Sequence, residues 1–281
     1  MSPATARAAG PAGSDGDVDA ANAGPPQAAG AGSIKSAERV LDLLQLIASE
    51  GSQAWTFSDL RARLDLPKSS LHGLLRVLTD RGYLDLDPDD KSYRIGVSAW
   101  QVGRSFLFAE QLATVARIHL RQARVDLNET FQVSILDGVD NVYITKEESD
   151  QPLRLVSEVG SRLPAYTTGL GKVLLAGLTV EEVEDRFRGR EFVTFTPSTV
   201  ASYDALKSQL DEVRAQGFAE DHGEFTEGVY CVAVPIRNAA GATVAAVSCS
   251  IPSARLQDAH ATRERALAVL RTCADAISEA L

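Results

Sequence analysis

The chain has 281 residues, of which 44% are hydrophobic, and this is enough for about two domains with buried cores. Its formal net charge of −10 has the wrong sign for a protein whose whole surface contacts nucleic acid. No apolar run approaches the ~18 residues of a membrane span, and three cysteines are too few for a disulfide framework. We therefore expect a cytoplasmic, reduced protein with neither a secretory signal nor a membrane partner.

Residues 1–33 have the composition of a disordered tail. Between Met1 and Ser33, 21 residues are Ala, Gly or Pro, and Val18 is the only β-branched aliphatic residue. Such a segment cannot bury enough apolar surface to offset the conformational entropy lost on folding.

The charge beyond this tail is unevenly distributed. Residues 34–104 contain ten basic and ten acidic residues, whereas residues 105–281 contain 17 basic and 25 acidic residues. Because electrostatic attraction depends on local charge, a neutral N-terminal domain with clustered basic residues can still bind phosphate.

Residues 34–96 have the periodicity of three short helices and a hairpin. The first helix is predicted to end at Gly51, and its apolar face is formed by Ala37, Val40, Leu41, Leu44, Ile47 and Ala48. The second helix, FSDLRARL, has Ser58 as its expected N-cap. The third begins near Pro67 and ends at Gly82, and its core face is formed by Leu71, Leu74, Leu75 and Leu78. YLDL and SYRI, separated by DPDDK, are the expected strands of the hairpin.

The opposite face of the third helix carries hydrogen-bond donors at a pitch that suits DNA. Its serines and histidine can bond phosphates or base edges, and Arg76 can reach a phosphate or pair with guanine. The candidate DNA-binding residues are Lys68, Ser69, Ser70, His72, Arg76 and Arg94. The acidic hairpin opposes DNA binding, so a solvated polar face remains an alternative interpretation.

Three stretches of this region, SIKSAERVLDLLQLIASEG, FSDLRARLDLPKSSLHGLLRVLTDRGYL and YRIG, resemble the winged helix-turn-helix of the IclR family of transcriptional regulators. The resemblance implies that the serine-rich helix enters the major groove of an operator in double-stranded DNA. One position departs from the family pattern, because Gly73 stands where an arginine usually follows the position of His72. This glycine removes a phosphate or base contact and lowers helix propensity by roughly 1 kcal/mol relative to alanine.

Residues 97–128 are predicted to form a helical linker of one or two helices. An apolar stripe along it consists of Leu112, Val115, Ala116, His119, Leu120, Ala123 and Leu127. We interpret His119 as a hydrogen-bonded structural residue. A long helix between two domains suits a lever or a dimer contact.

Residues 129–281 are predicted to form an α+β domain. TFQVSILDG, NVYITKEE and LRLVSEVG have strand patterns, and TGLGKVLLAGL, TVEEVEDRF and YDALKSQLDEVRAQG have helix patterns. GVYCVAVPIRN and ATVAAVSCSIP predict two further strands that turn at Ala240 and Gly241, and the chain closes on a helix. Because strands and helices are segregated, we expect an antiparallel sheet.

Enzymatic motifs in this domain are incomplete. TTGLGKVLL lacks the glycine and the hydroxyl of a phosphate-binding loop, since Tyr166 and Val173 occupy those positions. His222 and Cys231 have the chemistry of a base and a nucleophile, but no oxyanion-hole signal accompanies them. A metal site that adds Cys249 to this pair lacks the close ligand spacing of zinc motifs. We expect neither an enzyme nor a cofactor, although a cysteine-dependent enzyme remains an alternative.

Strand alternation places Ser248 and Ser250 on one side of the last strand, where their hydroxyls can bond a ligand or the neighbouring backbone. SRLPAYTTGLGKVLLAGL, RAQGFAEDHGEFTEGVYCVAVPI and GATVAAVSCSIP resemble the GAF-like effector domain of the IclR family. The resemblance implies a small-molecule effector, an organic acid or an aromatic metabolite. The effector-binding residues that it implies are Thr168, Gly169, Asp221, Cys231, Ser248 and Ser250. The helix start at Thr168 favours an anion, whereas Asp221 disfavours one unless it is protonated or paired.

The resemblance spans residues 34–281 and implies a winged helix-turn-helix domain (34–96), a helical linker (97–128) and an effector-binding and oligomerisation domain (129–281). We therefore expect a ligand-responsive repressor or activator that acts as a homodimer or homotetramer. Its effector is expected to change the spacing of two recognition helices. A winged-helix domain that binds proteins instead of DNA is the second alternative.

Overall fold

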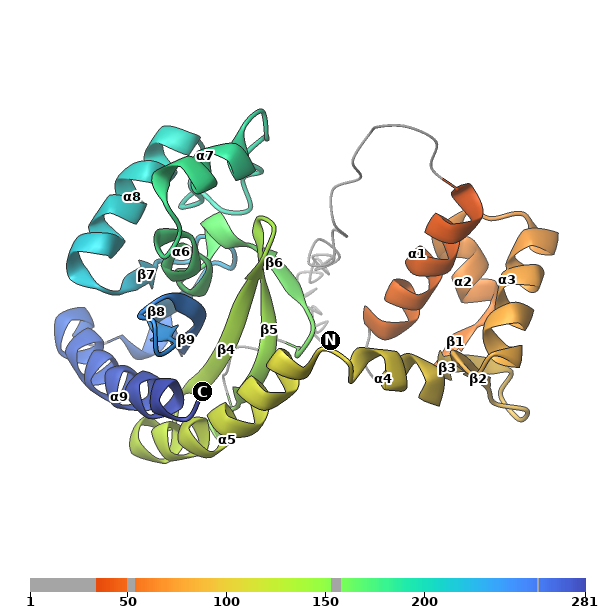
Figure 1. Ribbon diagram of the computed structural model, residues 1–281, viewed down its shortest axis with the longest axis horizontal. Coiled ribbons are helices and arrows are strands. Elements are labelled where there is room, and N and C mark those ends of the chain that lie inside the picture. The colour runs from red at the N-terminus through yellow and green to blue at the C-terminus, as the bar shows by residue number, and fades with distance from the viewer. Residues whose placement is uncertain (1–33, 50–53, 153–157, 257) are drawn as a thin grey trace, which may run out of the picture.

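The computed structural model describes residues 34–49, 54–152, 158–256 and 258–281, and it shows two lobes joined by helix α4, Val97–Gly103 (Figure 1). The predicted disordered tail lies outside these residues, as do the expected helix end at Gly51 and most of the strand predicted in LRLVSEVG. Within the described part of the chain, no helix is both long and apolar enough to cross a membrane.

The N-terminal lobe consists of three helices packed on a small antiparallel sheet. The helices are α1 (Lys35–Ser49), α2 (Phe57–Leu64) and α3 (Lys68–Asp80). The strands are β1 (Trp55–Thr56), β2 (Leu84–Leu86) and β3 (Ser92–Ile95), in the order β1-β3-β2. The core is formed by Leu43, Ile47, Trp55, Leu60, Leu66, Leu71, Leu75, Leu78 and Leu84. The three helices and the hairpin of the sequence prediction are thus present, and β1 is an addition.

Two local predictions in this lobe are wrong. Helix α2 is capped by Thr56 instead of Ser58, because the Thr56 hydroxyl accepts the N–H of Asp59 while the Asp59 carboxylate accepts the N–H of Thr56. Helix α1 turns Leu43 into the core and leaves Leu41 59% exposed. Its apolar residues cover more than one face, so periodicity alone does not decide which face is buried.

The C-terminal lobe is built on one six-stranded antiparallel sheet in the order β6-β5-β4-β9-β8-β7. The strands are β4 (Thr130–Asp137), β5 (Asp140–Glu147), β6 (Arg162–Pro164), β7 (Ala219–Asp221), β8 (Val229–Arg237) and β9 (Thr243–Pro252). The mixture of helices with an antiparallel sheet confirms the predicted fold class. The sequence patterns did not predict the two short edge strands, β6 and β7.

Helices cover both faces of this sheet (Figure 1). One face, here the α5/α9 face, packs against α5 (Leu107–Leu127) and α9 (Ala259–Glu279). The other, here the α6 face, packs against α6 (Gly169–Ala176), which is followed by α7 (Val180–Phe187) and α8 (Tyr203–Gln216). The predicted linker 97–128 therefore comprises α4 and also α5, whose Leu112, Ala116 and Leu120 are fully buried in the core of the C-terminal lobe.

Close packing at the start of α6 depends on Gly171. A Cβ atom at this position would lie only 2.2 Å from the carbonyl oxygen of Ala165, in the 3₁₀ turn Ala165–Thr167 (η2). Gly171 of the TTGLG stretch thus allows α6 to pack closely against the preceding 3₁₀ turn and is not part of a phosphate-binding loop.

Gly171→Ala is expected to lower the free energy of unfolding by about 1–3 kcal/mol, because the added methyl group must displace backbone. Gly73→Ala is the control, since a Cβ at Gly73 meets nothing within 4 Å and should stabilise α3 by roughly 1 kcal/mol. Thermal unfolding followed by circular dichroism measures both changes. Equal midpoints for the wild type and Gly171→Ala would contradict the packing argument.

Candidate DNA-binding helix and effector site

Helix α3 has one buried face and one exposed face, as the sequence pattern predicts. Its buried residues are Leu71, Leu75 and Leu78. Five of the six candidate DNA-binding residues lie on it: Lys68, Ser69, His72 and Arg76 are exposed, and Ser70 is half-buried. Gly73 is exposed beside them and faces open space. Arg76 makes no ion pair with any described residue, so its guanidinium is available to a ligand.

His72 differs from its neighbours because its ring rests on another helix. The imidazole stacks on Phe57 of α2, with ring centroids 4.2 Å apart and an interplanar angle of 25°. This contact fixes the side chain at the junction of the two helices. Lys68, Ser69 and Arg76 are exposed on the same helix, and no aromatic contact is recorded for them.

The acidic hairpin is explained by turn chemistry. Asp87 accepts the N–H of Asp89 at 2.9 Å, and Asp90 accepts the N–H of Ser92 at 2.8 Å, so both carboxylates hold the β2–β3 turn. The same two carboxylates lie 3.8 and 3.6 Å from the guanidinium of Arg94. Arg94 is thus partly neutralised within the hairpin, and its charge is less available to a phosphate than that of Arg76.

On β9, alternate residues serve opposite faces of the large sheet. Ser248 and Ser250 point to the α6 face and are 1% exposed, while the intervening Cys249 lies in the core on the α5/α9 face. Both hydroxyls donate to the side-chain oxygen of Gln132 on β4, at 3.4 and 3.0 Å. The sulfur of Cys231 lies 3.1 Å from the hydroxyl oxygen of Ser250. A polar layer is thus buried across three neighbouring strands.

The start of α6 lies against this layer. Thr168 caps the helix, because its hydroxyl oxygen accepts the N–H of Gly171 at 2.9 Å and donates its proton to Asn141 at 2.8 Å. A Cβ at Gly169 would lie 3.5 Å from the Cβ of Ala233 and 3.8 Å from that of Asp221. The structure therefore gathers all six predicted effector-binding residues around the start of one helix.

A buried ion pair holds α6 against the loop that follows β7. The ammonium of Lys172 lies 2.6 Å from the carboxylate of Glu224 and 3.1 Å from the amide oxygen of Gln209 on α8. Asp221 accepts the backbone N–H of Glu224 at 2.8 Å. Burial raises the pKa of Asp221 to about 7, the nearby Glu224 carboxylate acts in the same direction, and the N–H of Glu224 and the charge of Lys172 oppose the shift.

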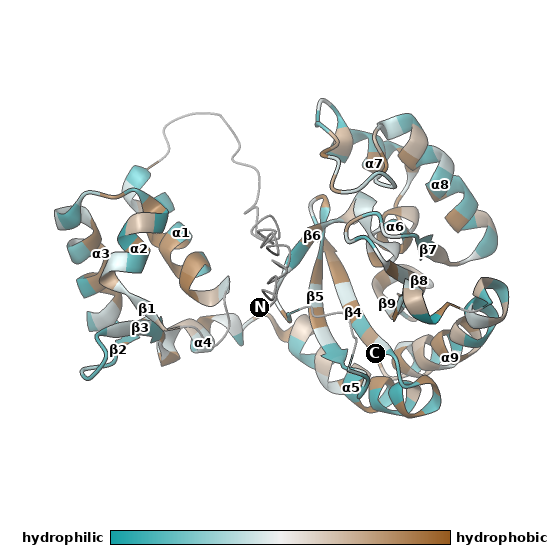
Figure 2. Cartoon of the chain, turned by 180° about the vertical axis from the view of Figure 1, so that it is seen from behind, coloured by the Kyte–Doolittle hydropathy of each residue, from teal (hydrophilic) through white to brown (hydrophobic). Residues whose placement is uncertain are grey.

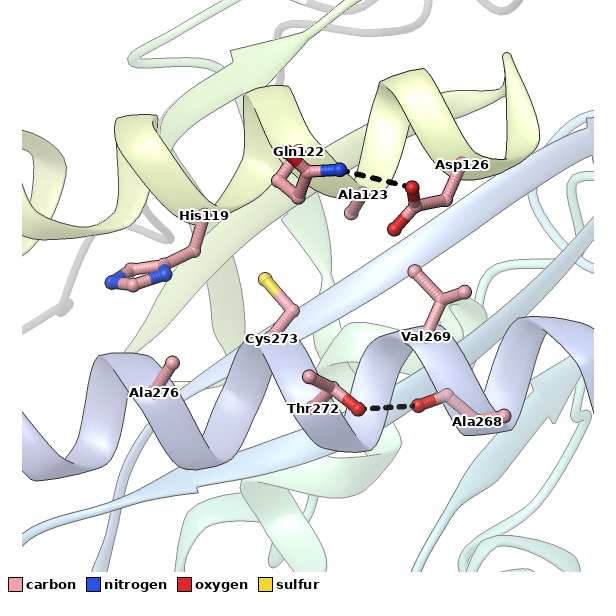
Figure 3. Close-up of a pocket in the computed structure, with 9 residues that line it drawn as sticks. All are labelled: His119, Gln122, Ala123, Asp126, Ala268, Val269, Thr272, Cys273 and Ala276. Atoms are coloured by element: carbon pink, nitrogen blue, oxygen red, sulfur yellow. Dashed lines mark hydrogen bonds between the residues drawn. The ribbon is translucent and has the colours of Figure 1, made fainter.

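A separate groove of about 290 Å³ lies between α5 and α9 (Figure 3). His119 stands at its edge and Cys273 faces it, and the ring of His119 makes no side-chain hydrogen bond within the residues that the structure describes. The predicted hydrogen bond of His119 is therefore absent there. No group of three or more His, Cys, Asp or Glu residues in the described ranges is arranged to hold a metal ion.

Two family models match the chain. The model of the bacterial transcriptional regulator IclR C-terminal domain matches residues 105–279, and that of the IclR helix-turn-helix domain matches residues 36–88. The chain belongs to the IclR family. The predicted function of a ligand-responsive, DNA-binding transcriptional regulator is thereby confirmed.

Individual IclR-family proteins are similar along most of the chain. The regulator XynR of Escherichia coli K12 is 36% identical over 227 residues, which cover 81% of this chain and 90% of XynR. KdgR of the same organism is 32% identical over 246 residues, covering 88% and 92%. An IclR homologue from Microbacterium hydrocarbonoxydans, crystallised with 4-hydroxybenzoate, has a TM-score of 0.76 at 25% identity and covers 88% of this chain and 98% of that one.

Several residues of the polar layer were not predicted from the sequence. They are Gln132, Asn141, Tyr143, Thr145, Lys172 and Glu224, each 5% exposed or less. The alternation of polar and apolar residues in TFQVSILD and DNVYITKE contains the signal, because Thr130, Gln132 and Ser134 share one face of β4. Lys172 and Glu224 are 52 positions apart, and no local pattern predicts their pairing.

Asp221→Asn is expected to flatten the dependence of stability on pH. A carboxyl whose pKa rises on folding contributes stability that is fully present below its unfolded pKa of 3.8 and is lost as the pH rises through about 7. The wild type should therefore lose about 2–3 kcal/mol of unfolding free energy between roughly pH 5 and pH 8 that the variant does not lose. Urea denaturation at several pH values measures this difference. Asp275→Asn on the exposed side of α9 is the control, and parallel pH curves for all three proteins would contradict the expectation.

Proposed function

We propose that this IclR-family protein binds its operator in the cytoplasm through α3 and is controlled by a small molecule bound on the α6 face of its sheet. The observation that supports this most directly is the pairing of two sites in one chain. One is an exposed helix face with Ser69 and Arg76, and the other is a buried polar layer at the start of α6. The first suits a polyanion outside the protein, and the second suits an enclosed small ligand.

On the DNA side, each candidate residue has a distinct role. We assign base-edge contacts to Ser69, Arg76 and His72, with His72 braced by Phe57. We assign backbone phosphates to Lys68, Ser70 and Arg94, because Lys68 begins the helix and Arg94 lies on the hairpin.

On the effector side, we assign ligand contacts to residues at the start of α6 and on β7, β8 and β9. They are Thr168, Gly169, Asp221, Cys231, Ser248 and Ser250. An organic acid or an aromatic metabolite fits this set, because hydroxyls and helix N–H groups are donors to anionic or hydroxyl oxygens. The homologue crystallised with 4-hydroxybenzoate, which is both aromatic and an acid, supports this class.

The chemistry of Cys231 does not favour the alternative of a cysteine-dependent enzyme. Burial raises the pKa of its thiol well above the ordinary value, and the neighbouring Asp221 raises it further, so the reactive thiolate is disfavoured. The expected partner base, His222, is exposed, and its ring nitrogen lies 3.8 Å from the carboxylate of Glu220. We accordingly propose a sensor without catalytic activity or cofactor.

Exposed apolar residues at the junction of the lobes indicate a second copy of the chain as partner. Helix α4, which joins the two lobes (Figure 2), exposes Val97, Trp100 and Val102 by 58–60%. Apolar side chains at this density are unusual on a monomer surface. We propose a homodimer through this surface, which places two α3 helices on one operator, and further pairing of dimers gives a homotetramer.

The effector then controls operator binding by shifting the protein between two arrangements of the same oligomer. An effector that binds one arrangement more tightly increases its population. Because half-sites on DNA lie one or more helical turns apart, a changed spacing of the two α3 helices changes operator affinity. The scheme serves a repressor and an activator equally.

Arg76→Ala is expected to weaken operator binding by about 1–3 kcal/mol, since it removes an unpaired guanidinium from the exposed face of α3. Arg94→Ala should cost less, because Asp87 and Asp90 already neutralise that charge. Fluorescence anisotropy with an operator selected from genomic fragments measures both, and affinity should fall steeply with salt. Unchanged affinity of Arg76→Ala, or no binding to any fragment, would favour a protein-binding winged helix instead.

Val102→Glu is expected to yield monomers, because it places a charge in the proposed dimer contact. Val193→Glu is the matched control, since that valine is 56% exposed on the C-terminal lobe against 58% for Val102. Sedimentation velocity measures the oligomeric state of each protein. The dimer surface is misplaced if Val102→Glu sediments like the wild type, or if Val193→Glu dissociates equally.

A further inference from the structure

We propose that α5 pairs antiparallel with α5 of a second copy of the chain through a stripe of six residues on its outer face. The inference rests on the homotetramer of the proposed function and names the surface through which two dimers pair. The stripe, here called the α5 stripe, consists of Leu107, Gln111, Thr114, Ile118, Arg121 and Val125.

No element of the described chain covers the α5 stripe. All six residues are exposed, and the exposed fractions of Leu107, Ile118 and Val125 are 70%, 72% and 66%. The buried residues of the helix, among them Ala116 and Leu120, lie on the opposite face and belong to the core of the C-terminal lobe. Large apolar side chains that recur along an exposed helix face indicate an interaction surface.

The spacing of the α5 stripe is that of a seam between paired helices. Its members follow one another at intervals of 4, 3, 4, 3 and 4 residues, the alternation that keeps side chains on the seam of a coiled coil. When the two helices run antiparallel and cross level with Ala116, every member of the stripe meets a member of the second copy. The three layers, each formed twice, are Leu107 on Val125, Gln111 on Arg121 and Thr114 on Ile118.

The same register is favourable for the charges beside the stripe. Glu110 lies six residues before Ala116 and Arg121 lies five residues after it, so Glu110 of each copy comes level with Arg121 of the other. Within the chain, the two side chains have only exposed ion pairs, at 3.7 Å from Arg104 to Glu110 and 3.9 Å from Arg121 to Glu147. Such exposed pairs hold their side chains weakly.

Charge complementarity therefore selects the partner and its direction. A parallel pair would bring Arg121 onto Arg121 of the second copy, whereas the antiparallel pair brings it beside Glu110. A surface that complements itself in both its apolar layers and its charges fits a two-fold symmetric contact, in which each interaction occurs twice. The occupant that this surface fits is thus another copy of the same helix.

The side of α5 that faces α9 is open to the same partner. The groove of Figure 3 lies there, and α9 contributes the small side chains of Ala268, Thr272 and Ala276 to its wall. Small side chains let a second helix approach closely, so α9 does not block the stripe. Because α4 precedes α5, an antiparallel pair places the two α4 helices at opposite ends, where each remains available for the proposed dimer contact.

Cysteine cross-linking of the full-length chain tests the register. The double variant Leu107→Cys/Val125→Cys should form covalently linked pairs of chains when it is oxidised with copper phenanthroline and examined on non-reducing gels. The two single variants are the controls and should stay unlinked. In this register two copies of the same position are eighteen residues apart along the helix axis, which is roughly 27 Å. The native thiols of Cys231, Cys249 and Cys273 are buried and leave the background low.

Sedimentation velocity tests the contribution of the stripe to assembly. The wild type should sediment as a tetramer and Ile118→Glu as a dimer, because the substitution places a charge in a central apolar layer. Val193→Glu is the control, since Val193 is 56% exposed on the same lobe and lies outside the α5 stripe. It should assemble like the wild type.

The inference is overturned if the double cysteine variant stays unlinked, if the single variants link as readily, or if Ile118→Glu assembles like the wild type. Failure of the proposed function has different signs, namely wild type that binds no operator or Val102→Glu that assembles unchanged. A specific cross-link in the double variant supports the pairing of α5 in either case.

Discussion

The buried ion pair between Lys172 and Glu224 holds together the elements on which the effector side of this protein depends. Its two partners are 3% and 4% exposed and belong to α6 and to the loop after β7. Loss of one partner would leave an uncompensated buried charge, which typically costs 3–5 kcal/mol. The hydroxyl of Thr199 donates to the backbone oxygen of Glu224 at 2.6 Å, so the loop is tied a second time. The start of α6 is thereby fixed against β7 before any ligand arrives.

Neighbouring residues on a strand point to opposite faces of the sheet, so the polar layer on the α6 face is joined to the core on the α5/α9 face. On β9, Ser248 and Ser250 face α6, while Val247 and Cys249 pack under α5 and α9. A ligand on the α6 face that shifts the strands must therefore also repack α5 and α9 on the opposite face of the sheet, because protein interiors leave few voids to absorb a shift. Helix α5 carries Leu120 in this core, and residues 104–106 connect it to α4. It is the shortest covalent path from the sheet to the DNA-binding lobe.

The features of the fold that depend on local periodicity could be predicted from the sequence. The exposed face of α3, the order of the helices and of the strands other than β1, β6 and β7, and the opposite orientation of neighbouring residues on β9 could all be predicted. The cap of α2 could not, because Thr56 and Ser58 are both good caps and only the paired Asp59 carboxylate distinguishes them. Contacts such as Ser248 to Gln132 join residues 116 positions apart, so they require the strand order of the sheet.

The small number of unpaired cations on α3 and the hairpin supports the proposed homodimer. Gly73 offers no side chain on the outward face of α3, and Arg94 is partly neutralised by two aspartates of the hairpin. Of the three candidate DNA-binding cations, Lys68 and Arg76 thus remain without an ion pair among the described residues, and few phosphate contacts give weak binding by one copy of the N-terminal lobe. When two weakly binding N-terminal lobes are joined, the second lobe binds DNA in an intramolecular step. Its effective concentration at the DNA depends on the distance between the two lobes. In the proposed homodimer, operator occupancy would then depend mainly on the distance between the two α3 helices, which is the quantity that an effector at the proposed site would change.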